Sequence, residues 1–217
     1  MRVIDLTHPI EPGMPVYPGT EGPRLETANT CEKDGFRETL LTLYSHTGTH
    51  MDAPAHLYAD GTTLDRFPAA QFVGSAVVVD CSELRAGQPM TMAHVERQRE
   101  AADGAEFLLF RTGWDRYWGQ DAYFGDYPCI DLEVVDYVLR TGKKGIGLDT
   151  IGLDPIADAN LTRHKRLLAG GAVVVIENLK GLGRIGRGPF TLCALPLQFR
   201  DADGAPVRAV AMLEGNG

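Results

Sequence analysis

The segment Ala172-Val-Val-Val-Ile176 constrains the fold more than any other part of the chain. A continuous run of mostly β-branched residues is typical of a strand that is buried on both faces. Glu177 follows this run directly, and a carboxylate at the end of a buried strand is costly unless a cationic group meets it. The sequence therefore predicts a covered sheet with Glu177 facing either a metal ion or a basic side chain. Four basic residues are near enough in sequence for a salt bridge: Arg163, Lys165, Lys180 and Arg184.

Other segments show the alternation of strands or the periodicity of helices. We expect strands at 2–6, 36–44, 75–80, 106–111, 145–149, 172–176, 191–197 and 207–213, and helices at 91–101, 131–140 and 155–168. Strands outnumber helices, and the two kinds of element interleave mainly in the middle of the chain. These patterns predict an α/β fold, with a mixed, partly barrel-like β-sheet and helices outside it.

Composition favours a single domain spanning residues 1–217, because 44% hydrophobic residues can build one substantial core. The formal net charge of -8 argues against nucleic acid or an anionic membrane as a partner, since both require clustered basic residues. No apolar run approaches the ~20 residues that cross a bilayer, and the amino terminus does not resemble a signal peptide. The four cysteines show no close spacing, which favours free thiols. We therefore expect a cytoplasmic protein.

Four potential metal or proton ligands lie within eleven residues: His46, His50, Asp52 and His56. Imidazole and carboxylate groups at this density suit a divalent metal, although single histidines and aspartates more often form structural hydrogen bonds or turns. Gly48 and Pro54 disfavour a helix, so we expect the ligands on a bent loop at a strand end. Gly48 would let the backbone fold close to the ion.

This segment matches the pattern H-x-G-T-H-x-D-x-P-x-H, and it resembles the signature of the cyclase-like metal hydrolases. That family includes bacterial kynurenine formamidase and isatin hydrolase. The resemblance covers nearly the whole chain. It extends to Asp5–Ile10, Met14–Gly19, Arg111–Trp114, Gly147–Thr150, Glu177–Leu179, Ala194–Leu197 and Pro206–Ala209.

The resemblance implies a division of roles among the residues. His46, His50 and Asp52 would bind a first ion, Asp52 could bridge to a second ion, and His164 and Glu177 would complete that second site. His56 would be the proton donor and acceptor. The resemblance also implies a swivelling β/β/α fold and a homodimer or homotetramer with active sites near a subunit interface. His164 and Glu177 are one residue further apart than is usual in the family, and the turn at 169–172 could absorb this difference.

Mixed nitrogen and oxygen ligands favour zinc, with manganese as the alternative, at one or two ions per subunit. Such an ion lowers the pKa of a bound water to about 7, so that hydroxide can attack an amide carbonyl while His56 transfers the proton. We expect a small-molecule substrate, namely a small amide or cyclic amide cleaved in an arylformamidase-like reaction.

N-formylkynurenine is a candidate substrate, and isatin-like cyclic amides or lactones are alternatives. Tyr17 stands where kynurenine formamidases usually carry tryptophan, and it could stack on an aromatic substrate or simply pack on its flanking prolines. A different class of function is a non-catalytic metal-binding or ligand-binding protein. Such a protein would not need His56 as a free base beside a metal ion whose ligands are already complete.

Overall fold

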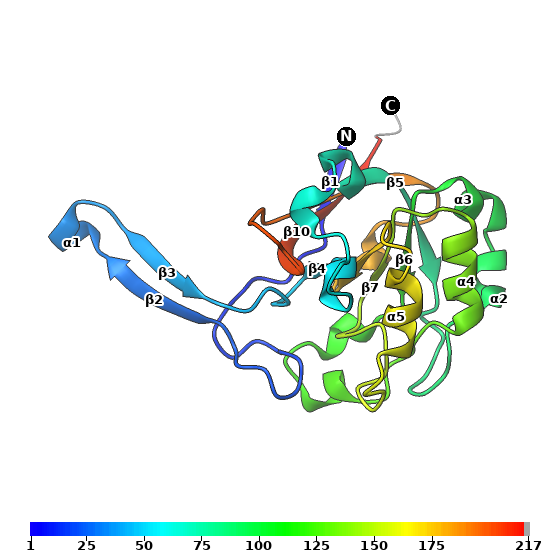
Figure 1. The fold of residues 1–217 in the computed structure, drawn as a ribbon, viewed down its shortest axis with the longest axis horizontal. Helices are drawn as coiled ribbons and strands as arrows, with labels where there is room; N and C mark the ends of the chain where they lie inside the picture. Colours follow the sequence, from blue (N-terminus) through cyan, green and yellow to red (C-terminus); the bar gives the residue numbers. More distant parts are fainter. Residues whose placement is uncertain (215–217) are drawn as a thin grey trace.

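The computed structural model describes residues 1–214, and its centre is a closed β-barrel (Figure 1). Its strands are β4 (His50–Asp52), β5 (Val73–Asp80), β6 (Phe107–Arg111), β7 (Gly145–Leu148), β8 (Val174–Glu177), β9 (Phe190–Pro196) and β10 (Gly204–Leu213). They pair in the order β10-β4-β8-β7-β6-β5-β9. The last strand of this order, β9, also pairs with the first, β10, and this pairing closes the barrel. Strands β5 to β8 are parallel, and the other pairs are antiparallel. Strand β1 (Arg2–Asp5) extends the sheet beside β10.

Alternate residues of the central strands pack into two separate hydrophobic cores. In β6, Phe107 and Leu109 belong to the core inside the barrel, and Leu108 and Phe110 belong to a second core outside it. Helices cover this outer core on one side of the barrel (Figure 1). They are α2 (Met92–Glu96), α3 (Arg99–Gly104), α4 (Leu132–Arg140) and α5 (Thr162–Leu168). Strand β8 is fully buried in the same way, which confirms the expected burial on both faces.

The described part of the chain, residues 1–214, also contains six short 3-10 helices that connect these elements: η1 (Pro54–His56), η2 (Leu64–Arg66), η3 (Ala69–Phe72), η4 (Trp114–Tyr117), η5 (Asp121–Phe124) and η6 (Leu182–Arg184). The expected fold class, a mixed barrel-like sheet with outer helices, is confirmed. Each expected strand overlaps an observed one, and two further strands were not expected: β4 and β2 (Arg24–Asn29).

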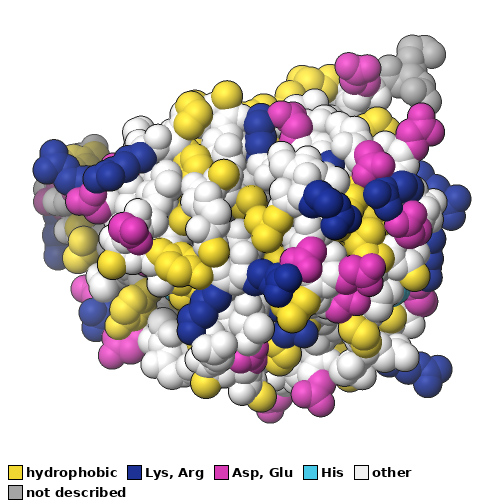
Figure 2. Space-filling view, turned by 45° about the vertical axis from the view of Figure 1, so that its right-hand side comes forward, with side chains coloured by type: hydrophobic (Ala, Val, Ile, Leu, Met, Phe, Trp, Pro, Cys, Tyr) yellow, Lys and Arg dark blue, Asp and Glu magenta, His cyan; other side chains and the backbone are white. Residues whose placement is uncertain are grey.

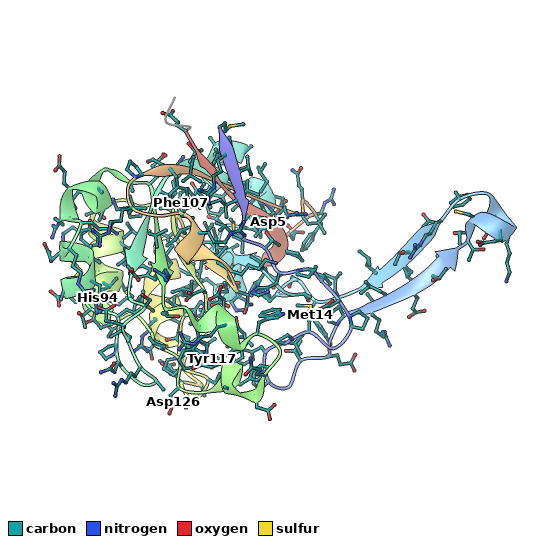
Figure 3. All side chains as sticks on the ribbon, turned by 180° about the vertical axis from the view of Figure 1, so that it is seen from behind. Asp5, Met14, His94, Phe107, Tyr117 and Asp126 are labelled. Atoms are coloured by element: carbon teal, nitrogen blue, oxygen red, sulfur yellow. The ribbon has the colours of Figure 1, made fainter. Side chains whose placement is uncertain are left out.

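A two-stranded hairpin projects from the body and contacts it only at its base (Figures 1 and 3). It consists of β2, the short helix α1 (Cys31–Asp34) at the tip and β3 (Glu38–Thr42), and we call residues 24–42 the arm. All five residues of β3 are exposed, and so are most residues of β2. Figure 3 shows Met14 near the base of the arm.

Two expected helices differ from the observed ones. The segment 91–101 begins a helix after Thr91 as expected, but the helix is interrupted at Gln98, whose φ of -144° and ψ of 40° are not helical. The helix expected at 155–168 begins only at Thr162. Asp158 accepts the backbone N–H groups of Asn160 and Thr162, and these bonds stabilise a turn in place of the first helical turns.

The expected loop position of the clustered ligands is only partly correct. His46 and Gly48 lie in a bend, and Gly48 has the positive φ of 67° that favours glycine. His50 and Asp52, however, lie on the short strand β4. This strand forms because β8 and β10, which are distant in sequence, pair with it on both sides.

Acidic and basic side chains are interspersed on the face that carries the helices (Figure 2). Within residues 1–214, no helix combines the length and the apolar character that a bilayer span requires.

Candidate metal centre and active site

Strand pairing brings His50, Asp52 and Glu177 to one face of the barrel wall. His50 lies directly opposite Glu177 in the antiparallel pair β4–β8, and the next residues, Met51 and Ile176, point into the barrel core. Because side chains alternate along a strand, the three polar residues point outward together. His50 Nε2 is 3.2 Å from Asp52 Oδ1 and 3.5 Å from Glu177 Oε2.

His46 reaches the same carboxylate from the bend that precedes β4. Its Nδ1 is 2.7 Å from Asp52 Oδ1, and its Nε2 is 3.0 Å from Asp203 Oδ2. The imidazole lies against the backbone of Gly204, where a Cβ atom would overlap the ring. The first residue of β10 must therefore be small for His46 to take this position.

Helix α5 contributes His164 from the opposite side. Its Nε2 is 3.1 Å from Glu177 Oε1 and 3.4 Å from Asp52 Oδ2, and its Nδ1 is 2.7 Å from Asp154 Oδ2. Asp154 also accepts the backbone N–H groups of Arg163 and His164 at the start of the helix. The longer spacing between His164 and Glu177 does not prevent their contact, because the chain turns at Gly171, whose φ is 71°.

Each of the three imidazoles has one nitrogen held by an acceptor and the other turned toward the carboxylates. The acceptors are Asp203 for His46, the Gly48 carbonyl for His50 at 2.8 Å, and Asp154 for His164. Outer acceptors of this kind fix the tautomer and ring orientation of metal-binding histidines. Ligand atoms about 2.0–2.1 Å from one ion lie roughly 3 Å apart, which is the spacing seen here. The donor set therefore fits a divalent metal ion.

Two groups of potential ligands share Asp52. Its Oδ1 faces His46 and His50, and its Oδ2 faces His164 beside Glu177. In each group the ligand atoms lie within 4.8 Å of one another. The arrangement could hold one ion in each group, with Asp52 between them.

The electrostatics of the cluster favour positive charge. Burial lowers the pKa of His46, but its hydrogen bonds to Asp203 and Asp52 outweigh burial and raise this pKa to about 10. His164 is also buried, and its carboxylate partners likewise raise its pKa well above the usual value. Burial raises the pKa of Asp52, yet the surrounding imidazoles hold it well below its ordinary value. The same carboxylates that stabilise the protonated imidazoles would stabilise a bound cation.

The alternative expectation for Glu177, a salt bridge to Arg163, Lys165, Lys180 or Arg184, is not met within residues 1–214. Within residues 1–214 the ion-pair partners of Glu177 are His50 and His164, and its Oε1 also accepts the backbone N–H of Leu153 at 2.8 Å. Arg163 instead pairs with Asp154 at 3.5 Å. The end of β8 therefore faces imidazoles, as the metal hypothesis requires.

His56 differs from the other three histidines. It lies on η1, half-buried, with its ring centroid 4.0 Å from that of His46, and its side chain has no hydrogen-bond or ion-pair partner within residues 1–214. It also belongs to a third group of ligand-type atoms, with His46 and Asp203. Burial is the main cause that lowers the pKa of His56, which keeps the ring neutral and able to accept a proton at neutral pH.

The clustered histidines and carboxylates line one cavity of about 650 Å³: His46, His50, Asp52, His56, Asp154, His164, Glu177 and Asp203. Tyr17 also lines it, with 40% of its surface exposed. Two residues of the site, Asp154 and Asp203, were not predicted from the sequence. Asp154 precedes a proline and reads as a turn residue, and nothing in the sequence relates Asp203 to the His46–His56 segment.

Comparisons with known proteins identify the family of this chain. The family model named Cyclase ("Putative cyclase") matches residues 4–155. A kynurenine formamidase of Bacillus thuringiensis (strain Al Hakam) is 32% identical over 209 residues, which cover 95% of each chain. Isatin hydrolase A from Ralstonia solanacearum superposes with a TM-score of 0.86 at 25% identity, over 98% of this chain and 92% of that one. A structure described as a "predicted metal-dependent hydrolase from Bacillus stearothermophilus" has a TM-score of 0.78 at 27% identity, over 97% of each chain. The chain belongs to the Cyclase family.

Proposed function

We propose that this protein is a metal-dependent hydrolase that cleaves a small amide or cyclic amide. One observation carries the proposal: three imidazoles are each oriented by an outer acceptor toward Asp52 and Glu177, and an unpaired imidazole, His56, lies in the same cavity. The kynurenine formamidase and isatin hydrolase relatives support this type of reaction.

The residues that would hold the metal follow from the contacts of Asp52. His46, His50 and Asp52 would bind a first ion, and His164, Glu177 and the second oxygen of Asp52 would bind another. Zinc is our first choice and manganese the second, because the ligands are a mixture of nitrogen and oxygen. A bound ion would supply Lewis acidity, lowering the pKa of a coordinated water to about 7 and stabilising the oxyanion of the attacked carbonyl.

His56 would move the proton. Its ring lines the cavity beside His46, and no residue among 1–214 is a hydrogen-bond acceptor for it, so both nitrogens are free to exchange protons. Its lowered pKa favours the neutral form that accepts a proton from water. The resulting imidazolium would then donate that proton to the leaving nitrogen, which makes amine departure possible.

The substrate we favour is a small aromatic amide. The cavity volume of about 650 Å³ lies in the range of small-molecule sites, roughly 300–1,000 Å³. Tyr17 provides an aromatic surface on its wall. N-formylkynurenine is the leading candidate because of the kynurenine formamidase relatives, and isatin-like cyclic amides or lactones are the alternatives.

A hydrolysis screen tests this proposal. Purified protein would be assayed with N-formylkynurenine, isatin and simple lactones, each before and after exhaustive chelation. We expect turnover of at least one compound, and we expect chelation to abolish it. If the metal-loaded protein hydrolysed none of these compounds, the result would favour the other class of function, a non-catalytic binding protein on this scaffold.

We also propose that the chain forms a homodimer or homotetramer, with the arm in the interface. An isolated two-stranded hairpin is marginally stable in water, yet the arm exposes Leu25, Phe36, Leu40 and Leu41. Burial of these side chains by a second copy would stabilise the arm.

A cytoplasmic location is our proposal as well, supported by the free thiols of Cys31, Cys81, Cys129 and Cys193.

A further inference from the structure

Asn178 occupies an unusual backbone position directly after Glu177. Its φ is 57°, in the left-handed region that non-glycine residues seldom adopt and that asparagine tolerates best. The residue is 5% exposed, so each of its polar groups needs a protein partner. All of them have one. These hydrogen bonds hold both the backbone and the side chain of Asn178 in place.

The side chain of Asn178 is held in one orientation. Its Nδ2 donates to the Gly48 carbonyl at 2.9 Å, and its Oδ1 accepts from the Tyr123 hydroxyl at 2.7 Å. The Gly48 carbonyl can only accept, so the amide nitrogen must face it and the oxygen must face Tyr123. The reverse orientation of the amide would place two acceptors against each other.

The Gly48 carbonyl is the link to the metal cluster. The same oxygen that accepts from Asn178 also accepts from His50 Nδ1 at 2.8 Å. A carbonyl oxygen has two acceptor sites, and the bond from Asn178 holds this one in position for the imidazole. With Nδ1 engaged in this way, His50 Nε2 faces Asp52 and Glu177.

The backbone of Asn178 secures the same loop. Its carbonyl accepts from Thr49 Oγ1 at 2.6 Å, and its N–H donates to the Thr150 carbonyl at 3.0 Å. Thr49 Oγ1 in turn accepts the backbone N–H of His8. Asn178 thus ties the segment that carries His50 to β8, to the end of β7 and, through Tyr123, to η5.

We infer that Asn178 is a positioning residue, which together with Tyr123 fixes the imidazole of His50 for metal binding through the Gly48 carbonyl. The metal part of this inference rests on the proposed function. Outer-shell partners of metal ligands typically affect metal affinity by about 10–100-fold. Substitution of Asn178 should therefore lower the affinity for zinc in a protein that is still folded.

Two variants and one control test the inference. Asn178→Asp keeps the size and the left-handed preference of the residue but removes the Nδ2 donor, and Tyr123→Phe removes only the hydroxyl. Tyr137→Phe is the control, because Tyr137 is equally buried but its hydroxyl bonds Asp103, outside the site. Zinc affinity would be measured by competition with a chromophoric chelator, beside the melting temperature and the wild-type hydrolysis rate.

We expect about a 10-fold or larger loss of zinc affinity in Asn178→Asp, a smaller loss in Tyr123→Phe and none in Tyr137→Phe. If Asn178→Asp does not fold, Tyr123→Phe alone decides. Wild-type zinc affinity in the folded variants, with only a lower melting temperature, would overturn the inference. Zinc binding by the wild type without any hydrolysis would contradict the proposed function but leave this inference intact.

Discussion

Within residues 1–214, His56 is the one histidine of the cavity whose ring has no hydrogen-bond acceptor, whereas His46, His50 and His164 each have one. A general acid–base group contributes about 100- to 10,000-fold to the rate, so His56→Ala should lose at least about 100-fold in kcat while it retains bound metal. Elemental analysis and steady-state kinetics would check both parts. His94→Ala is the matched control, because the ring of His94 caps α2 away from the site. Wild-type hydrolysis by His56→Ala would contradict the proton-transfer role.

The residues that could be predicted from the sequence are those with a local pattern. His46, His50, Asp52 and His56 lie close together in the chain, and the structure brings them together with His164, Glu177 and Tyr17 around one cavity. Asp203 could not be found in this way, because it meets His46 only through the pairing of β10 with β4. Contacts set by tertiary pairing leave no spacing signal in the sequence.

At the level of elements, the close contact between β10 and His46 gives a sharp prediction. Gly204→Ala places a methyl group where the His46 ring lies, so the imidazole must move away from Asp52. We expect at least about a 10-fold loss of zinc affinity, as for other disturbances of a ligand's position. Gly104→Ala, at the end of α3 with open space around its Cβ position, should leave the affinity unchanged. Equal zinc affinity in both variants would contradict the geometry described for His46.

Helix α3 depends on a buried lysine at its carboxyl end. Lys143 is 4% exposed, and its Nζ donates to the carbonyls of Ala102, Asp103 and Ala105. Lys143→Met would leave these carbonyls without their donor and should lower the free energy of unfolding by about 2 kcal/mol or more. Chemical denaturation would measure this change in the free energy of unfolding. The exposed Lys165→Met should change stability by less than about 0.5 kcal/mol, and a similar loss in both variants would refute this role of Lys143.

The predictable elements are those whose own sequence specifies them. The β-branched run of β8 and the helix expected at 131–140 are both present, and Asp131 caps that helix, α4, by accepting the N–H of Val134. Strand β4 is only three residues long and contains the ligands themselves, so its strand character comes from its partners β8 and β10. The break at Gln98 likewise carries no signal in the helical pattern of 91–101.

At the scale of the whole molecule, the arm is the surface that the body leaves uncovered. Leu40 and Leu41 are 54% and 55% exposed, and as neighbours on a strand they point to opposite faces of the hairpin. We expect light scattering to show a dimer or tetramer for the wild type and a monomer for Leu40→Glu combined with Leu41→Glu. Leu132→Glu, at the start of α4, is the control and should keep the wild-type mass. A monomeric wild type would contradict the proposed assembly.

The central claim is that turnover depends on metal held by the Asp52 cluster. The most direct measurement is the hydrolysis rate of chelated protein as zinc is added back, with bound zinc determined by elemental analysis in the same samples. We predict no turnover in metal-free protein, and a rate that rises in proportion to bound zinc and levels off at one or two equivalents. Full turnover by protein shown to be metal-free would contradict the claim.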